Sequence, residues 1–251
     1  MRLLQPSIDA ACGKLDRIAA GAERAVTPNA TAAAGPGDAA PDDGAACWVA
    51  EESALLRGLN HSLSNRVAAV SALAGVLEAD EAPGAQLTAA LASESRRLET
   101  VLRLLRLLAG MPGAGTEPIQ LGELLPEVAL LHAQHADFRE GEPATVTGAP
   151  DALPVVTTTM SLVRAVLALL SAARGAGARA ALDYDGDERV VRLRVSPEPA
   201  APLDPSLAER AAAAARWLLR GDEASVRVGD GGFVVELPTL LEIRRRRTRG
   251  G

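Results

Sequence analysis

Few side chains in this sequence are able to do chemistry, and one histidine stands apart from the rest. His61 lies in the stretch NHSLSN, with the amide side chain of Asn65 one helical turn later. A neutral imidazole is a competent nucleophile for phosphoryl groups near physiological pH. The sequence therefore predicts His61 as a candidate phosphoryl acceptor.

The other candidate groups favour structural roles. His132 and His135 lie about one turn apart without a cysteine or an acidic motif beside them, so they are predicted to be ordinary helix residues rather than metal ligands. Cys12 and Cys47 fit no metal-ligand spacing, and two cysteines make no disulfide framework. For Ser171 and Ser196 the sequence identifies no neighbouring base.

Two amphipathic helices are predicted around His61. The first runs over about 51–79 and the second over about 86–109, with Pro83 and Gly84 between them. Each helix carries an apolar stripe at spacings of three, four or seven: Leu56, Leu59, Leu63, Val70, Leu73 and Leu77, then Leu87, Leu91, Leu98, Leu102 and Leu105. One hairpin buries only part of such stripes. A second copy would complete a four-helix bundle, so we expect a homodimer.

His61 is predicted to face away from this apolar seam. At 100° per residue it lies about 160° from both Leu59 and Leu63. Its own face carries small and polar residues: Ala54, Arg57, Asn65, Ala68 and Ala72. Small side chains let another backbone approach closely, so we expect a partner protein to dock over Ala54, Arg57, Ala68 and Ala72.

The rest of the chain alternates between helices and strands. Helices are predicted at 123–138, 160–174 and 207–219, the last of them opened by a capping box of Ser206 and Glu209. Strands are predicted at 144–148, 179–185, 188–196, 224–228 and 233–237. Helices interspersed with antiparallel strands favour an α+β sandwich, a fold in which helices cover one face of a sheet.

Four segments follow from these elements. Residues 1–45 are expected to hold a short helix and a flexible linker, and residues 46–112 the helical hairpin. Residues 113–240 form the α/β domain. The Arg-rich tail at 241–251 is expected to be a disordered, solubilising end.

Composition excludes several classes of protein. The chain has 251 residues and a formal net charge of −6, and this acidity argues against a nucleic-acid partner. No apolar run reaches the roughly 18 residues needed to span a membrane, and the N-terminus lacks the apolar region of a signal peptide. We therefore expect a soluble, cytoplasmic protein without a membrane span.

In the order of these elements the sequence resembles the bacterial sensor histidine kinases. NHSLSNRVAAVSALAGVLE is similar to the H-box of their dimerisation and phosphotransfer domain. SLVRAVLALLSAARGAG stands where the N-box helix of their Bergerat-type ATPase domain belongs, and LAERAAAAARWLLRGDEASVRVGDGGFVVELP resembles the end of that domain. The resemblance covers about residues 50–240. It implies a dimeric hairpin followed by an α/β sandwich of the histidine-kinase ATPase type.

The positions that hold nucleotide in this family are changed here. Ala168 and Ala172 replace the two N-box asparagines, and a methyl group cannot coordinate Mg²⁺, which demands oxygen ligands. The stretch VSPEPAAP replaces the Asp-x-Gly-x-Gly motif that reads adenine, with Pro197 at the Asp position and Pro199 and Ala201 at the glycines. The resemblance thus implies a degenerate domain that binds no ATP and needs no cofactor of its own.

The H-box departs from the family pattern as well. Family kinases place an acidic residue directly after the histidine as the base for autophosphorylation, and here that residue is Ser62, a poor general base. Asn65 takes the place that, in the family, positions a water for dephosphorylating a partner aspartate. The groups for making phosphohistidine from ATP are absent, whereas those for exchanging or removing a receiver's phosphate remain.

Four functions are compatible with this pattern. The first is a histidine phosphotransferase, similar to those that pair a hairpin dimer with a nucleotide-free kinase-like domain. In it His61 would shuttle a phosphoryl group between aspartates of response-regulator receiver domains, which would bring their own Mg²⁺. The alternatives are a response-regulator phosphatase that uses Asn65, a non-catalytic dimeric adaptor, and a divergent sensor kinase that still binds ATP.

Overall fold

The structure is a computed structural model that describes residues 42–79, 84–109, 115–137, 142–149, 152–176, 179–229 and 231–249. All of them belong to one unit, Ala40–Gly251. The helix and most of the linker predicted in residues 1–45 lie outside the described residues.

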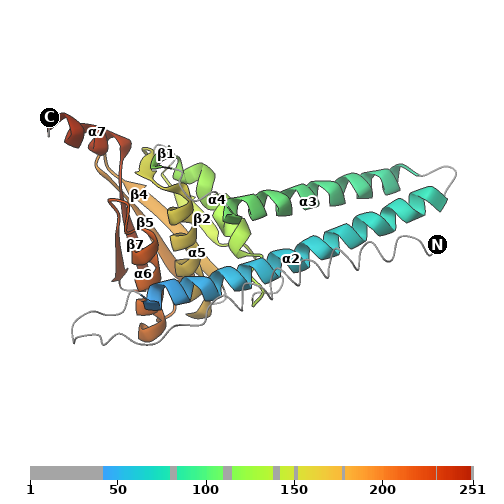
Figure 1. The fold of residues 1–251 in the computed structure, drawn as a ribbon, viewed down its shortest axis with the longest axis horizontal. Coiled ribbons are helices and arrows are strands. Elements are labelled where there is room, and N and C mark those ends of the chain that lie inside the picture. Colours follow the sequence, from blue (N-terminus) through green and yellow to red (C-terminus); the bar gives the residue numbers. More distant parts are fainter. Residues whose placement is uncertain are drawn as a thin grey trace, which may run out of the picture. The chain divides into compact units, whose positions relative to one another are not determined.

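Helices α2 (Asp42–Ala79) and α3 (Ala85–Ala109) form the predicted hairpin, and they run antiparallel in Figure 1. α2 begins at Asp42 instead of near residue 51, so the predicted linker is too long. The first turns of α2 lack a strong apolar period, yet Trp48 is only 3% exposed because this part of the helix packs on the α/β domain. Tertiary packing of this kind outweighs local helix preference.

Burial changes along the hairpin. Near the α/β domain Leu55 and Leu59 of α2 are fully buried, and Leu104 and Leu108 of α3 are each only 1% exposed. Further out, no side chain between residues 60 and 78, or between 85 and 100, is buried. The described part of the outer hairpin therefore has its apolar seam only half covered.

A five-stranded sheet with the order β2-β4-β5-β7-β6 lies at the centre of the α/β domain. Its strands are β2 (Thr145–Gly148), β4 (Arg179–Gly186), β5 (Val190–Glu198), β6 (Ser225–Gly229) and β7 (Gly232–Pro238). β2 pairs with β4 in parallel, so the prediction of antiparallel strands is wrong for this pair. The chain between them contains helix α5 (Thr159–Ala176), which supplies the crossover that parallel strands require.

Helices α5 and α6 (Pro205–Leu218) pack against one face of this sheet (Figure 1), as the predicted mixed architecture requires. The alternation in β5 explains the orientation: Val191, Leu193 and Val195 are buried, and the residues between them face the other way. On that opposite face the Arg194 guanidinium lies 3.0 Å from Asp183 and 2.7 Å from Asp185 on β4. The uncovered face is therefore charged and solvated.

Two short elements were not predicted. β1 (Glu117–Ile119) and β3 (Val155–Thr157) form a two-stranded antiparallel sheet, and three residues are too few to produce a periodic signal. Helix α4 (Leu121–His132) follows β1 and ends earlier than expected. The prediction of a helix to residue 138 is wrong, and His135 lies beyond the helix.

The start of α6 differs from the predicted capping box. Asp204 is the N-cap, and its carboxylate accepts a hydrogen bond from the Leu207 N–H at 2.8 Å. Pro205 takes the first helical position, where a missing N–H costs nothing. Ser206 consequently lies inside the first turn, so the predicted pairing of Ser206 with Glu209 is wrong.

The Arg-rich tail is ordered over most of its length, so the prediction of a disordered end is wrong for its described part. It forms helix α7 (Leu240–Arg249), which begins with a backbone bond from Leu240 N–H to the Pro154 carbonyl. The Arg245 guanidinium lies 2.6 Å from Glu188, which ties the helix to the loop before β5. Within the described ranges, no helix has both the length and the apolar character needed to cross a membrane.

Candidate functional site

His61 lies on α2 just beyond the α/β domain, and its imidazole is exposed, as the helical spacing predicts. The Asn65 side-chain nitrogen lies 3.1 Å from His61 Nε2. An amide nitrogen donates and has no lone pair to accept with, so Nε2 is the acceptor in this contact. The two residues meet because an i, i+4 pair shares one face of a helix.

The exposed face of α2 around His61 is shorter than predicted. Arg57, Ala68 and Ala72 are exposed, but Ala54 is only 4% exposed. The segment after α4 covers it, and the Ala136 N–H donates to the Ala54 carbonyl at 3.3 Å. This contact across the fold could not be read from the helix pattern, and it removes Ala54 from the predicted docking face.

Gly58 makes this close approach possible. A Cβ built on Gly58 would lie 1.6 Å from the carbonyl oxygen of Gln134, so any side chain there would displace the segment after α4. His61 is three residues further along α2, on the adjacent part of the same face. The exposed imidazole thus lies where the α/β domain ends and the uncovered hairpin begins.

In the part of the chain that the structure describes, the imidazole of His61 has no acidic contact. Ser62 is half-buried, and among the described residues no carboxylate forms a hydrogen bond or an ion pair with His61. One ion pair joins α2 to α3: Arg66 of α2 lies 3.0 Å from Glu94 of α3, and Arg97, also on α3, lies 2.7 Å from the same carboxylate. The Arg66 hydrogen bond lowers the pKa of Glu94. His61 therefore has a polar amide beside it but no acidic general base.

Ala168 and Ala172, which the sequence resemblance sets at the nucleotide-ligand positions of the kinases, lie on the side of α5 that α2 contacts. Ala168 and Ala172 of α5 are 5% and 3% exposed. Arg164 and Ser171 flank Ala168 on the same face of α5, because residues at i, i+4 and i+7 share a face. The side chain of Arg164 lies 3.7 Å from Glu52 and stacks 5.6 Å from the ring centre of Trp48.

Helix α2 also reaches α6. A Cβ on Gly44 of α2 would lie 3.1 Å from the Ala213 carbonyl and 3.1 Å from Trp217 Cβ, so the two helices touch closely at this point. α5 packs on β4 and β5 and is also contacted by α6 and α2. This explains why α5 is apolar nearly all round, a pattern typical of a fully buried helix.

One more position that the sequence resemblance singles out lies within the sheet. Pro197, which the resemblance sets at the adenine-reading aspartate of the kinases, is buried in β5 opposite Ala180. Pro199 follows the strand and is exposed, and Ala201 is half-buried. None of these three side chains carries a polar group that could read a base.

A buried polar cluster, which the sequence did not reveal, joins α2 to the α/β domain. Ser171 Oγ donates to Glu51 Oε1 at 2.5 Å and accepts from His132 Nε2 at 3.0 Å. His135 Nε2 lies 3.5 Å from the same Glu51 oxygen. Burial lowers the pKa of His132 to about 3, so its ring is neutral. The only sequence signal was the position of His132 in the apolar run VALLH.

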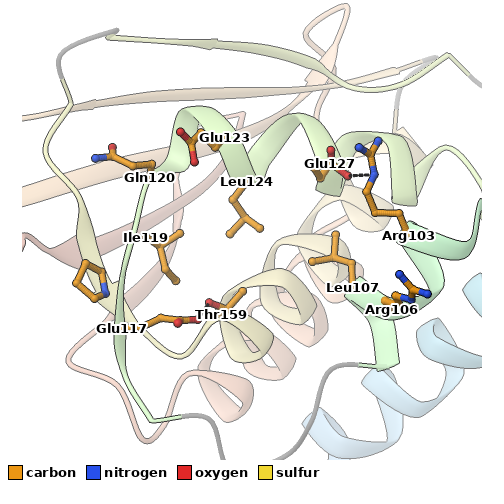
Figure 2. A pocket seen from close by; sticks show the side chains of 11 residues that line it. Arg103, Arg106, Leu107, Glu117, Ile119, Gln120, Glu123, Leu124, Glu127 and Thr159 are labelled. Atoms are coloured by element: carbon orange, nitrogen blue, oxygen red, sulfur yellow. Dashed lines mark hydrogen bonds and ion pairs between the residues drawn. The ribbon is translucent and has the colours of Figure 1, made fainter. Parts of the chain in front are cut away.

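An open groove lies between the end of α3 and the segment β1–α4, and its volume is about 540 Å³. Figure 2 shows the side chains that line it. Arg103 in this groove lies 3.1 Å from Glu127, and Glu117 accepts a hydrogen bond from Thr159. Leu107, Ile119 and Leu124 form its apolar wall. Much of its charge is already paired, and His61 does not line it, so the groove is separate from the candidate site.

Comparisons with known proteins give structural likeness without sequence support. No family model matches the chain, and no curated protein matches it. A bacterial phosphotransferase structure is 16% identical, with a TM-score of 0.37 over 80% of this chain and 98% of that chain.

Two histidine kinases give similar values. The catalytic domain of histidine kinase ThkA is 15% identical, with a TM-score of 0.39 over 50% of this chain and 97% of that one. The Acinetobacter baumannii histidine kinase AdeS is 13% identical, with a TM-score of 0.39 over 74% of this chain and 97% of that chain. At such scores the likeness carries no functional argument, which must come from the side chains of this protein.

Proposed function

We propose that this protein is a histidine phosphotransferase of a two-component relay, acting in the cytoplasm as a homodimer. His61 takes a phosphoryl group from the aspartate of one response-regulator receiver domain and gives it to another. The protein binds no ATP, and the receiver domain supplies Mg²⁺. The observation that carries this proposal is an exposed imidazole whose Nε2 accepts a hydrogen bond from a single amide donor, the side chain of Asn65.

Among the described residues His61 has no acidic partner, and this favours transfer over autophosphorylation. A kinase must remove or hold a proton while the imidazole attacks ATP, and Ser62 is too weak a base for that step. An acyl phosphate on a receiver is already activated. Its acceptor therefore needs only an exposed nucleophile of the correct tautomer, which the pair of His61 and Asn65 supplies.

The contacts of α2 with α5 support a nucleotide-free domain. A ligand lying over Ala168 would have to displace Trp48 and break the contacts of Glu51 and Glu52 with α5. Addition of Mg-ATP to the full chain should leave the melting temperature unchanged, because a ligand that does not bind the native state cannot stabilise it. A clear rise in melting temperature would favour the alternative of a divergent sensor kinase.

The uncovered apolar seam supports the homodimer. Leu56, Val67 and Leu102 are 46%, 42% and 41% exposed, although they belong to or adjoin the stripes expected inside a four-helix bundle. A Leu102→Arg variant should elute with the mass of a monomer in light scattering, whereas wild type should give twice the chain mass. An exposed control, Gln86→Arg, should stay dimeric. A monomeric wild type would contradict the bundle.

The test of function is incubation of the full chain with a phosphorylated receiver domain, followed by assay for acid-labile phosphate on His61. Wild type should acquire this phosphate, His61→Ala should acquire none, and Asn65→Ala should still acquire it. If His61→Ala discharges the receiver as wild type does, His61 is not the carrier.

A response-regulator phosphatase is the second candidate, and the amide of Asn65 beside the acceptor position favours it. Under this function Asn65→Ala abolishes discharge of the receiver while His61→Ala retains it. If neither variant changes discharge but the receiver still binds, the protein acts as an adaptor.

A further inference from the structure

The hydrogen bond between Asn65 and His61 does more than mark a polar surface. In a solvated neutral histidine, either ring nitrogen can carry the proton, and a hydrogen bond to one nitrogen decides which. Here the partner of Nε2 is an NH₂ group, which has no lone pair to accept with. The contact is therefore possible only in the tautomer with the proton on Nδ1.

We infer that Asn65 is a positioning residue that selects the Nδ1–H tautomer of His61 and so makes Nε2 the phosphoryl acceptor. This inference rests on the proposed function. It assigns Asn65 a role in forming phosphohistidine, and that role is distinct from orienting a water for hydrolysis.

The transfer step balances with these groups alone. The Nε2 lone pair forms the new N–P bond while the P–O bond to the receiver's aspartate breaks, and that electron pair leaves with the carboxylate. Nδ1 keeps its proton, so the ring carries one positive charge beside the phosphoryl group. The return step reverses each change, and no further acid or base is needed.

Asn65 has to release Nε2 during this step. Its amide remains one helical turn from the imidazole, where it can donate to a phosphoryl oxygen instead of to the ring. The amide therefore holds the acceptor nitrogen unprotonated before the partner arrives and does not block it afterwards. A carboxylate at the same position would do the opposite, because it accepts from Nε2–H and puts the proton on the acceptor nitrogen.

The experiment measures the tautomer directly. Full-length protein labelled with ¹⁵N-histidine is examined by long-range proton–nitrogen NMR at about pH 8.5, where an ordinary imidazole is neutral. Wild type should show His61 protonated on Nδ1. Asn65→Leu should show a mixture of tautomers, and Asn65→Asp should show the proton on Nε2. Ser71→Ala, on an exposed position of the same helix, should match wild type.

Kinetics and the site of phosphorylation complete the test. Relative to wild type, the initial rate of phosphoryl uptake should fall about 3-fold to 5-fold in Asn65→Leu and more than about 10-fold in Asn65→Asp. Asn65→Gln, which keeps a donor, should recover part of the rate. Phosphohistidine should be linked through Nε2 in wild type.

Three results would overturn the inference. The first is a wild-type ring protonated on Nε2, and the second is a tautomer unchanged in both Asn65→Leu and Asn65→Asp. The third is phosphate attached to Nδ1. If wild type has the Nδ1–H tautomer but takes no phosphate, the proposed function and the acceptor role both fail, while the effect of Asn65 on the ring stands as a separate result.

Discussion

Replacement of Ser171 by alanine should loosen α2 from the α/β domain. Ser171 Oγ donates to Glu51 at 2.5 Å, and the Glu51 side chain is only 12% exposed. A hydrogen bond to a charged group contributes about 1.5–3 kcal/mol, and its loss leaves the Glu51 carboxylate with the more distant His135 at 3.5 Å. We therefore expect Ser171→Ala to lower the free energy of unfolding by about 2 kcal/mol. In a chain of this size that corresponds to a fall in melting temperature of about 4–8 °C.

The assay is a double-mutant cycle with Glu51→Gln, followed by urea and thermal unfolding. If the two side chains interact directly, the double variant should lose less than the sum of the single variants, with a coupling energy of about 1–2 kcal/mol. A matched control comes from the exposed pair Ser225 and Glu236, whose oxygens are 3.3 Å apart. Ser225→Ala should change the free energy of unfolding by less than about 0.5 kcal/mol.

A coupling energy below about 0.5 kcal/mol would refute this reasoning. So would a loss in Ser171→Ala no greater than that in Ser225→Ala. Either result would mean that the contact between Ser171 and Glu51 does not hold α2 against α5.

Three further predictions concern stability. The pKa of His132 falls from 6.5 to about 3 on folding, so the unfolded chain binds more protons between these values. Stability should be full above about pH 6.5 and fall by up to about 1.4 kcal/mol per pH unit towards pH 3, and urea unfolding at several pH values should show a flatter slope in His132→Leu. Gly58→Ala should cost about 2–3 kcal/mol because its Cβ would overlap the Gln134 carbonyl, whereas Gly75→Ala, with open space around it, should gain about 0.5–1 kcal/mol. Equal shifts of melting temperature in these two variants would contradict the close approach at Gly58. Asp204→Ala should cost about 1 kcal/mol through loss of the α6 cap, while Ser206→Ala should be nearly neutral in the same thermal assay. A larger loss of stability in Ser206→Ala than in Asp204→Ala would support the capping box of Ser206 and Glu209 instead.

The elements that the sequence predicted well are those with a strong local period. Alternation of apolar residues with arginines defines β5, and the leucine stripes define α2 and α3 except for the first turns of α2. The exposure of His61 followed from the same helical geometry. Such features depend on residues less than about two turns apart, so a single sequence carries them.

The features that sequence reasoning missed depend on contacts between distant segments. Ser171 meets His132 from 39 positions away and Glu51 from 120 positions away, and no local pattern encodes either separation. The burial of Ala54 has the same cause, since the segment after α4 covers it. At α6 the error was local: Asp204 and Ser206 are both good capping residues, and Pro205 at the first helical position decides between them.

The continuity of α2 gives it a mechanical role. One unbroken helix runs from Gly44, which touches α6, through His61 and on to Ala79. At 1.5 Å per residue, His61 lies about 25 Å along the axis from Gly44. A tilt of α2 by about 5° about its contact with α6 would move the imidazole by about 2 Å, comparable to the displacement that separates a reactive approach from an unreactive one. Because α2 is one continuous helix, a movement of its first three turns on the α/β domain also moves the imidazole of His61.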